Sequence, residues 1–342
     1  MVSFGEAVDR VVGLGSHLLH GVRGAGENTV GDLGPYLDAP LEVMYPEPAV
    51  PRDVKRRRAR LTFGKDRVTE ILRWHSQHVV LCPHYRTRHA GEYWLNQRVT
   101  ARWIHPKAGP RRRALLYVHG WLEPGSWVEE ATLLPLWYRE LGVDTAHVQL
   151  PFHGRRRPKG QLFHGEWFWT ADLVRSLESV RQAVCDVRSA ILYFREHGYE
   201  EVGVTGLSLG GSITMLTACV EEGPDYVVPM IAHLALSEAV EDAGILWRMK
   251  TDLERFGLDR ARRKELFSRI RIGDAKPVLP PSRQLWVAAK EDAYLRAELV
   301  AKQAKEWGDP SVLWIDGGHM TFPLALDRIV GAMKQMPKLA VG

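Results

Sequence analysis

The segment G-L-S-L-G at residues 206–210 restricts the possible folds of this chain more than any other sequence feature. It joins Glu201–Thr205, whose pattern predicts a β-strand, to Leu209–Glu222, whose pattern predicts a helix. A strand that enters a helix directly turns sharply, and bulk two residues before or after Ser208 would clash. Glycine at both positions removes the clash, so Ser208 is predicted to sit strained at the positive end of the helix. The alternative is a glycine-rich turn that serves close packing only.

Strand-like and helix-like segments alternate on both sides of this turn. The predicted strands are Ala114–Val118, Val143–Leu150, Glu201–Thr205, Tyr226–Leu236, Leu285–Ala289 and Val312–Ile315. The predicted helices are Trp127–Leu141, Thr170–His197, Leu209–Glu222, Arg296–Trp307 and Phe322–Met333. Such alternation builds an α/β fold with a mostly parallel sheet covered on both faces. Two earlier extended segments, Val68–Val80 and Tyr93–Ile104, predict an antiparallel start to that sheet.

The chain divides into an N-terminal extension and one large domain. Residues 1–60 are rich in glycine, proline and charge, and residues 61–342 form the predicted domain. Within it, residues 237–280 break the alternation and predict a helical insert placed as a lid. In the extension, Phe4–Val22 predicts a helix packed on the domain; a weak amphipathic helix at a membrane interface is the alternative.

The charge pattern leaves several classes of partner open. The net charge is +5, with arginine clusters at Arg56–Arg58, Arg111–Arg113 and Arg155–Arg157. Such clusters bind anions or simply face water. No nucleic-acid recognition motif accompanies them, so no nucleic-acid partner is predicted. The oligomeric state stays open.

Cysteine usage and hydropathy indicate the compartment. Only three cysteines occur, Cys82, Cys185 and Cys219, without a CxxC pair, so neither a disulfide framework nor a zinc site is predicted. No metal and no other cofactor is expected. No apolar run reaches the length of a membrane span. We therefore predict a cytoplasmic protein, with peripheral membrane contact as an option.

Taken together, the turn at Ser208 and the order of segments around it resemble the α/β-hydrolase superfamily over about residues 65–335. The resemblance implies an eight-stranded, mostly parallel sheet with Ser208 as the nucleophile. The first strand of the parallel part ends in His119-Gly120-Trp121. In the superfamily a motif of this type completes the oxyanion hole, which implies the backbone N–H groups of Trp121 and Leu209 as donors.

The general base and its acid partner are expected after the last two strands. Gly317-Gly318 precedes His319, which the superfamily's order of serine, acid and histidine identifies as the base. Asp292 follows the strand Leu285–Ala289 and is the predicted acid, with Glu291 as its immediate competitor. Some members of the superfamily place the acid one strand earlier. The corresponding candidates are Glu238, Glu241 and Asp242.

A basic loop, residues 151–158, follows the strand Val143–Leu150. It resembles a segment of the alpha/beta-hydrolase domain-containing 18-like branch. The predicted substrate-binding side chains are His119, His153, Arg155 and Arg156. Arginines at the mouth of a pocket would favour an anionic group on the substrate, whereas the alternative is that they tie the loop to nearby acidic residues or face water. The aromatic run Trp167–Trp169 predicts either an acyl pocket or core packing.

These residues predict hydrolysis of a carboxylic ester, a small-molecule or lipid ester, through an acyl-enzyme on Ser208. Amide and thioester hydrolysis use the same triad and stay open, as does acyl transfer to an acceptor other than water. A non-catalytic ligand-binding protein with this fold is the alternative from another class.

Overall fold

The computed structural model describes residues 3–21, 32–60, 62, 64–123, 127–221, 223–242, 244–270, 272–337 and 339. Five predicted boundaries lie outside these residues: residue 1, Val22, residue 61, Glu222 and residue 342. The nine strands of one sheet are β1 (Lys55–Arg58), β2 (Arg67–His75), β3 (Arg98–Pro106), β4 (Arg113–Val118), β5 (Asp144–Val148), β6 (Glu201–Leu207), β7 (Val227–Met230), β8 (Leu285–Ala289) and β9 (Ser311–Ile315).

The strand order is β1-β2-β3-β5-β4-β6-β7-β8-β9. The first three strands pair antiparallel and β3 meets β5 antiparallel, whereas every pair from β5 to β9 is parallel. The predicted fold class is confirmed, but the sheet built by the described residues has nine strands instead of eight. The additional strand is β1, whose four basic residues are all exposed. It lacks an alternating pattern because it is an edge strand that contributes no side chain to the core.

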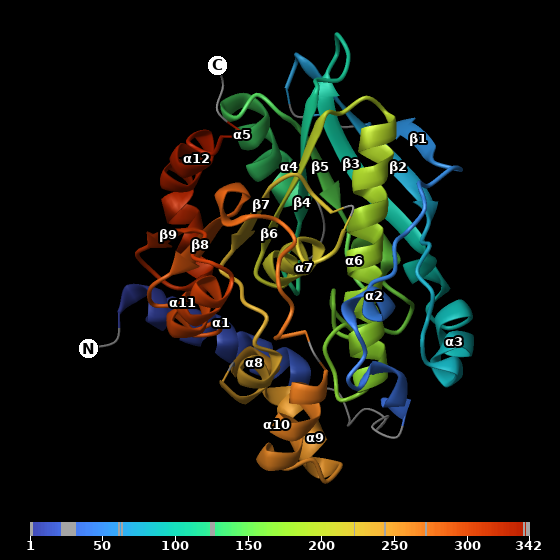
Figure 1. The fold of residues 1–342 in the computed structure, drawn as a ribbon, viewed down its shortest axis with the longest axis vertical. Coiled ribbons are helices and arrows are strands. Elements are labelled where there is room, and N and C mark those ends of the chain that lie inside the picture. Colours follow the sequence, from blue (N-terminus) through green and yellow to red (C-terminus); the bar gives the residue numbers. More distant parts are fainter. Residues whose placement is uncertain are drawn as a thin grey trace.

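Helices cover both faces of the sheet (Figure 1). They are α1 (Phe4–Gly21), α2 (Leu41–Met44), α3 (Pro83–Ala90), α4 (Trp127–Ala131), α5 (Leu133–Glu140), α6 (Leu173–Glu196), α7 (Leu209–Thr217), α8 (Leu236–Asp242), α9 (Trp247–Arg255), α10 (Arg260–Arg269), α11 (Ala297–Glu306) and α12 (Leu326–Lys334). Successive side chains of β4 point to opposite faces of the sheet and belong to two different hydrophobic clusters. Leu116 belongs to the hydrophobic cluster that includes side chains of α6, α7 and α11, whereas Leu115 and Tyr117 belong to the cluster that includes side chains of α5 and α12.

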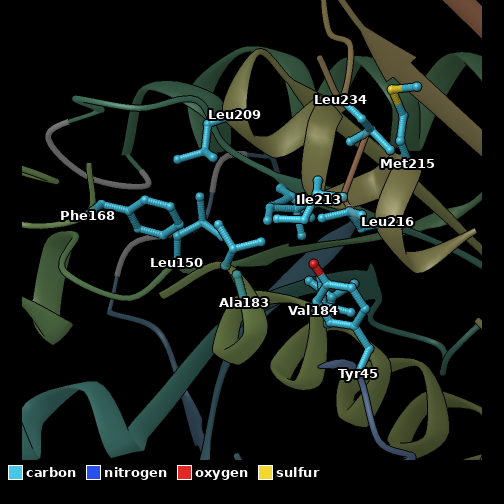
Figure 2. Close-up of a cluster of buried hydrophobic side chains, with 14 of the residues drawn as sticks. Tyr45, Leu150, Phe168, Ala183, Val184, Leu209, Ile213, Met215, Leu216 and Leu234 are labelled. Atoms are coloured by element: carbon cyan, nitrogen blue, oxygen red, sulfur yellow. The ribbon is translucent and has the colours of Figure 1, made fainter. Parts of the chain in front are cut away.

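The larger hydrophobic cluster lies between the sheet and two helices, α6 and α7. Helix α7 is the one that follows Ser208. Figure 2 shows Ile213 and Leu216 of α7 beside Ala183 and Val184 of α6, all of them buried. This packing holds the start of α7 against the sheet, so the turn that carries Ser208 rests on a rigid base.

Several predicted segments have different ends in the structure. The extended segment Val68–Val80 ends as a strand at His75, and α3 lies unpredicted before β3. The predicted helix Trp127–Leu141 is divided between α4 and α5 at Thr132. Pro135 explains the division, because it has no N–H to offer the preceding turn of a continuous helix.

Two further parts of the chain lie over the carboxyl edge of the sheet. Residues 237–280 contain α9, α10 and most of α8, and Asp259 caps α10 by accepting from the N–H of Arg262. Helix α1, blue in Figure 1, packs against the helical turn η7 (His319–Ala325) and against α9. In the part of the chain that the structure describes, every helix is too short or too polar to cross a bilayer.

Candidate active site

Ser208 lies at the sharp turn between β6 and α7. Its backbone has φ 54°, a left-handed conformation that costs free energy in a residue with a side chain. The flanking glycines explain how the turn is tolerated. A Cβ on Gly206 would overlap the backbone of Gly210, and a Cβ on Gly210 would overlap the ends of the His119 and Val118 carbonyls. The steric reason predicted for the two glycines therefore holds in the structure.

The three residues predicted as nucleophile, base and acid come together at the carboxyl ends of the strands. His319 Nε2 lies 2.9 Å from Ser208 Oγ, and His319 Nδ1 lies 2.7 Å from Asp292 Oδ2. Because a carboxylate only accepts, Nδ1–H donates to Asp292 and Nε2 is left to accept from the serine hydroxyl. This is the arrangement that lets an imidazole remove the serine proton.

Two backbone groups orient the Asp292 carboxylate. The N–H groups of Tyr294 and Leu295 each donate to Asp292 Oδ1 at 2.8 Å, which leaves Oδ2 for His319. Neighbouring Glu291 is exposed. Among the described residues, the carboxylate that is hydrogen-bonded to His319 is that of Asp292 and not that of Glu291.

The alternative acids one strand earlier lie elsewhere. Glu241 is paired with Arg263 and Lys250, and Asp242 is paired with Arg296. Glu238 is half-buried on α8. The geometry favours Asp292 over these three carboxylates.

The electrostatic surroundings of His319 keep it basic. Burial lowers its pKa, but the charge and hydrogen bond of Asp292, together with the charge of Asp9, outweigh burial and raise the pKa above 6.5. A raised pKa stabilises the imidazolium that forms when the serine proton is removed. Asp9 is on α1, and sequence reasoning missed it because nothing in its local pattern points to a residue 310 positions away.

The predicted oxyanion donors flank Ser208. Trp121 and Leu209 both line the cavity in front of the serine. Leu209 opens α7, where backbone N–H groups have no partner within the helix. Trp121 follows β4, and its indole N–H donates to the carbonyl of Gly165 at 2.8 Å, which fixes the side chain beside the site.

Glu123 is a second residue that sequence reasoning missed. Its Oε1 accepts from the N–H of Gly120 at 2.9 Å and from the Tyr117 hydroxyl at 3.3 Å. Burial and the neighbouring carboxyl of Glu129 raise the pKa of Glu123 well above its usual range. Through its hydrogen bonds to Gly120 and Tyr117, Glu123 supports the loop before Trp121.

The cavity in front of Ser208 has a volume of about 390 Å³ and is lined mainly by apolar side chains. They come from the sheet edge, α6, α7, the helical insert and α1. The lining includes Val12, Trp121, Leu122, Trp169, Val180, Leu207, Leu209, Ile213, Leu216, Leu234, Leu236, Ala239, Ile245, Leu246, Ile272, Leu295 and Phe322. A chamber of this size and polarity suits an apolar group of small-molecule dimensions.

The four predicted substrate-binding side chains are not among the residues that line this cavity. Arg156 is fully buried and donates to Asp186 at 2.6 Å and to the carbonyl of Gln149 at 2.7 Å. Its role is to tie the basic loop to α6, which is the alternative raised from the sequence. Arg155 is exposed.

The two histidines of that group are likewise internal. His119 accepts from the N–H of Leu150 at 3.0 Å, and burial lowers its pKa to about 4. His153 is fully buried and bonds through Nδ1 to the carbonyl of Pro151. The predicted substrate contacts through His119 and His153 are therefore replaced by contacts within the protein. Of the aromatic run 167–169, Trp169 reaches the cavity and Phe168 is buried in the core.

The sheet order, the strained Ser208 and the hydrogen bonds of His319 to Ser208 and to Asp292 are those of the α/β-hydrolase fold. Residues 98–252 match the model of the family described as alpha/beta hydrolase domain containing 18. The resemblance to this branch, predicted from the basic loop and the turn at Ser208, is confirmed.

Solved structures share this fold. The fold is similar to an acetyl xylan esterase from Paenibacillus sp. R4, with a TM-score of 0.60 at 13% identity over 85% of this chain and 98% of that one. It is also similar to acetyl xylan esterase 1 from Thermoanaerobacterium, with a TM-score of 0.56 at 15% identity over 90% and 95% of the two chains. At these identities the likeness concerns the fold alone.

A curated relative shares more of the sequence. An uncharacterized protein of Mycobacterium tuberculosis is 30% identical over 241 residues, which are 65% of this chain and 55% of the relative. The chain thus spans about half the length of the curated relatives that it matches.

Proposed function

We propose that this protein is a serine hydrolase that cleaves carboxylic esters through an acyl-enzyme on Ser208. The observation that carries the proposal is the continuous hydrogen-bond path from Ser208 Oγ through His319 to Asp292. Two solved structures with a similar fold are named as acetyl xylan esterases, and an ester is accordingly the substrate class that we propose.

The reaction follows from this path. His319 Nε2 takes the hydroxyl proton as Ser208 Oγ attacks the ester carbonyl, and Asp292 stabilises the imidazolium. The N–H groups of Leu209 and Trp121 would bind the oxyanion. His319 then gives its proton to the leaving alcohol. Water, deprotonated by the same nitrogen, attacks the acyl-enzyme carbonyl. The imidazolium then gives this proton to Ser208 Oγ as the carboxylic acid is released.

The apolar cavity supports an ester with an apolar acyl group. The described cavity lining contains no arginine or lysine, so an anionic acyl chain has less support than an apolar one. The carboxylate of a substrate would need a cation there, and Arg156 is committed to Asp186.

Filling the cavity is expected to change the preferred acyl length. Ala239 on α8 lines the cavity, and Ala239→Trp should lower kcat/KM for an octanoate p-nitrophenyl ester at least about 10-fold relative to the acetate ester. Each buried methylene contributes about 0.8 kcal/mol, or roughly fourfold, to discrimination. Ala301→Trp, at an exposed position of α11, is the matched control. Equal effects on both esters would show that the acyl group binds elsewhere.

Activity is expected to fall on the acidic side of neutrality. The base must be neutral, and the carboxylates that raise the pKa of His319 keep it protonated up to a higher pH. The rate is therefore lost as pH falls through that raised pKa, so the acidic limb of kcat/KM should lie above pH 6.5. A pH-stat assay of an acetate ester between about pH 5 and pH 9 measures it. A limb below 6.5 would mean that burial dominates over the two carboxylates.

Acyl transfer is a second outcome of the same acyl-enzyme. The apolar cavity favours it where an alcohol acceptor outcompetes water. Addition of a primary alcohol to the ester assay separates the two outcomes, since transfer yields a new ester whereas hydrolysis yields only the acid.

A further inference from the structure

Helix α1 is in direct contact with the loop that carries His319. A Cβ on Gly5 would overlap the backbone of Gly317 and Gly318, so the two segments touch without a side chain between them. The outer side of α1 exposes Phe4 and Leu14, whereas Asp9 on its inner side is fully buried. A buried carboxylate is costly unless donors surround it.

The donors to Asp9 come from both loops of the proposed triad. Asp9 Oδ2 accepts from the N–H of His319 at 2.7 Å and from the N–H of Ala293 at 3.1 Å. Asp9 Oδ1 accepts from the N–H of Met320 at 2.8 Å. One carboxylate therefore joins the residue proposed as base to the residue that follows the proposed acid.

Tyr294 also links α1 to the loop that carries Asp292. Its hydroxyl donates to the backbone carbonyl of Asp9, and its N–H donates to Asp292. Its ring centroid lies 5.2 Å from that of His319. The loop after β8, the loop after β9 and α1 thus form one hydrogen-bonded unit beside Ser208.

We propose that Asp9 is a positioning residue, which holds the His319 and Asp292 loops in register for proton transfer. The inference rests on the proposed role of His319 as the base. It makes α1, assigned from the sequence to an extension, part of the active site. Asp9 acts through backbone N–H groups and through its charge, and it does not touch the substrate position.

The test compares Asp9→Asn with Glu6→Gln. Both changes remove one negative charge from α1, but Glu6 is half-buried and pairs with Arg10 instead of with the His319 loop. The kinetic constants kcat and KM are measured with an acetate p-nitrophenyl ester, per site titrated with a fluorophosphonate. Hydrogen exchange at the backbone N–H groups of Ala293, His319 and Met320 is measured on the same proteins.

Asp9→Asn is expected to lower kcat about 10- to 100-fold, with KM changed less than about threefold, because small displacements of a catalytic group slow the chemical step. The acidic limb should move to lower pH, since Asp292, His233 and Tyr294 still face His319 while one nearby charge is gone. Exchange at the three N–H groups should increase. Glu6→Gln should leave all three readouts unchanged.

A purely structural role would give another pattern. If Asp9→Asn lowers the melting temperature but keeps kcat per titrated site and the acidic limb, the proposal is overturned. Asp9→Ala extends the series, and if it does not fold, Asp9→Asn carries the test alone. If the wild-type protein neither cleaves the ester nor reacts with the fluorophosphonate, the proposed function fails. Hydrogen exchange then still decides whether Asp9 holds the two loops, and unchanged exchange would overturn that as well.

Discussion

Replacing Ser208 with alanine is expected to lower kcat about 10⁶-fold, since removal of the nucleophile of a serine triad eliminates the acyl-enzyme route. The fold should be retained, because the Ser208 side chain points toward His319 and the turn is maintained by the flanking glycines. The measurement is ester hydrolysis together with covalent labelling by a fluorophosphonate, which reacts with an activated serine.

Ser212 offers a matched control for this experiment. It lies one turn further along α7 and lines the same cavity, but its hydroxyl donates to the carbonyl of His233. Ser212→Ala should therefore still be labelled, whereas Ser208→Ala should not. Labelling that persists in Ser208→Ala would mean that another residue is the nucleophile and would remove the basis of the proposed function.

The second large effect is expected for Asp292→Asn, which should lower kcat about 10⁴-fold at neutral pH. An amide at this position can donate to His319 Nδ1, which stabilises the tautomer with the proton on Nε2 and leaves no acceptor for the serine proton. Neutral asparagine also removes the charge that stabilises the imidazolium.

Glu291→Gln is the control, because Glu291 is adjacent in sequence and exposed. Its kcat should stay within about threefold of the wild-type value, as is usual for a surface carboxylate. The reverse result, a large loss for Glu291→Gln and a small loss for Asp292→Asn, would transfer the role of acid to Glu291.

Local sequence patterns predict the fold class correctly, but they predict the ends of strands and helices less accurately. Both ends of the strand Leu285–Ala289 are predicted correctly, because a short, uninterrupted apolar run between polar loops indicates a buried strand. The edge strand β1 was missed, since four consecutive basic residues carry no alternation. The division into two helices at Thr132 was missed because the apolar spacing continues across it.

The basic loop, residues 151–158, shows what a local sequence pattern cannot predict. Arg156 lies in a loop at the correct edge of the sheet, so a role in substrate binding was a reasonable hypothesis. The structure gives its guanidinium a buried partner, Asp186, at 2.6 Å. The loop sequence does not show that a residue of α6 is its partner. Nor does it show which way the side chains of the loop point.

By itself, the sequence determined the strand–helix alternation, the sharp turn at Ser208 and the order of the proposed triad along the chain. The first two features depend on glycine sterics and on apolar periodicity, which act over a few residues, whereas the order of the triad is what the resemblance to the α/β-hydrolase superfamily implies. Only the tertiary structure decided which of several acids faces His319, where the apolar cavity lies, and that Asp9 joins both loops. Those outcomes depend on how distant segments pack, because the desolvation and hydrogen bonding of a carboxylate are set by its neighbours in space and not by its neighbours in the chain.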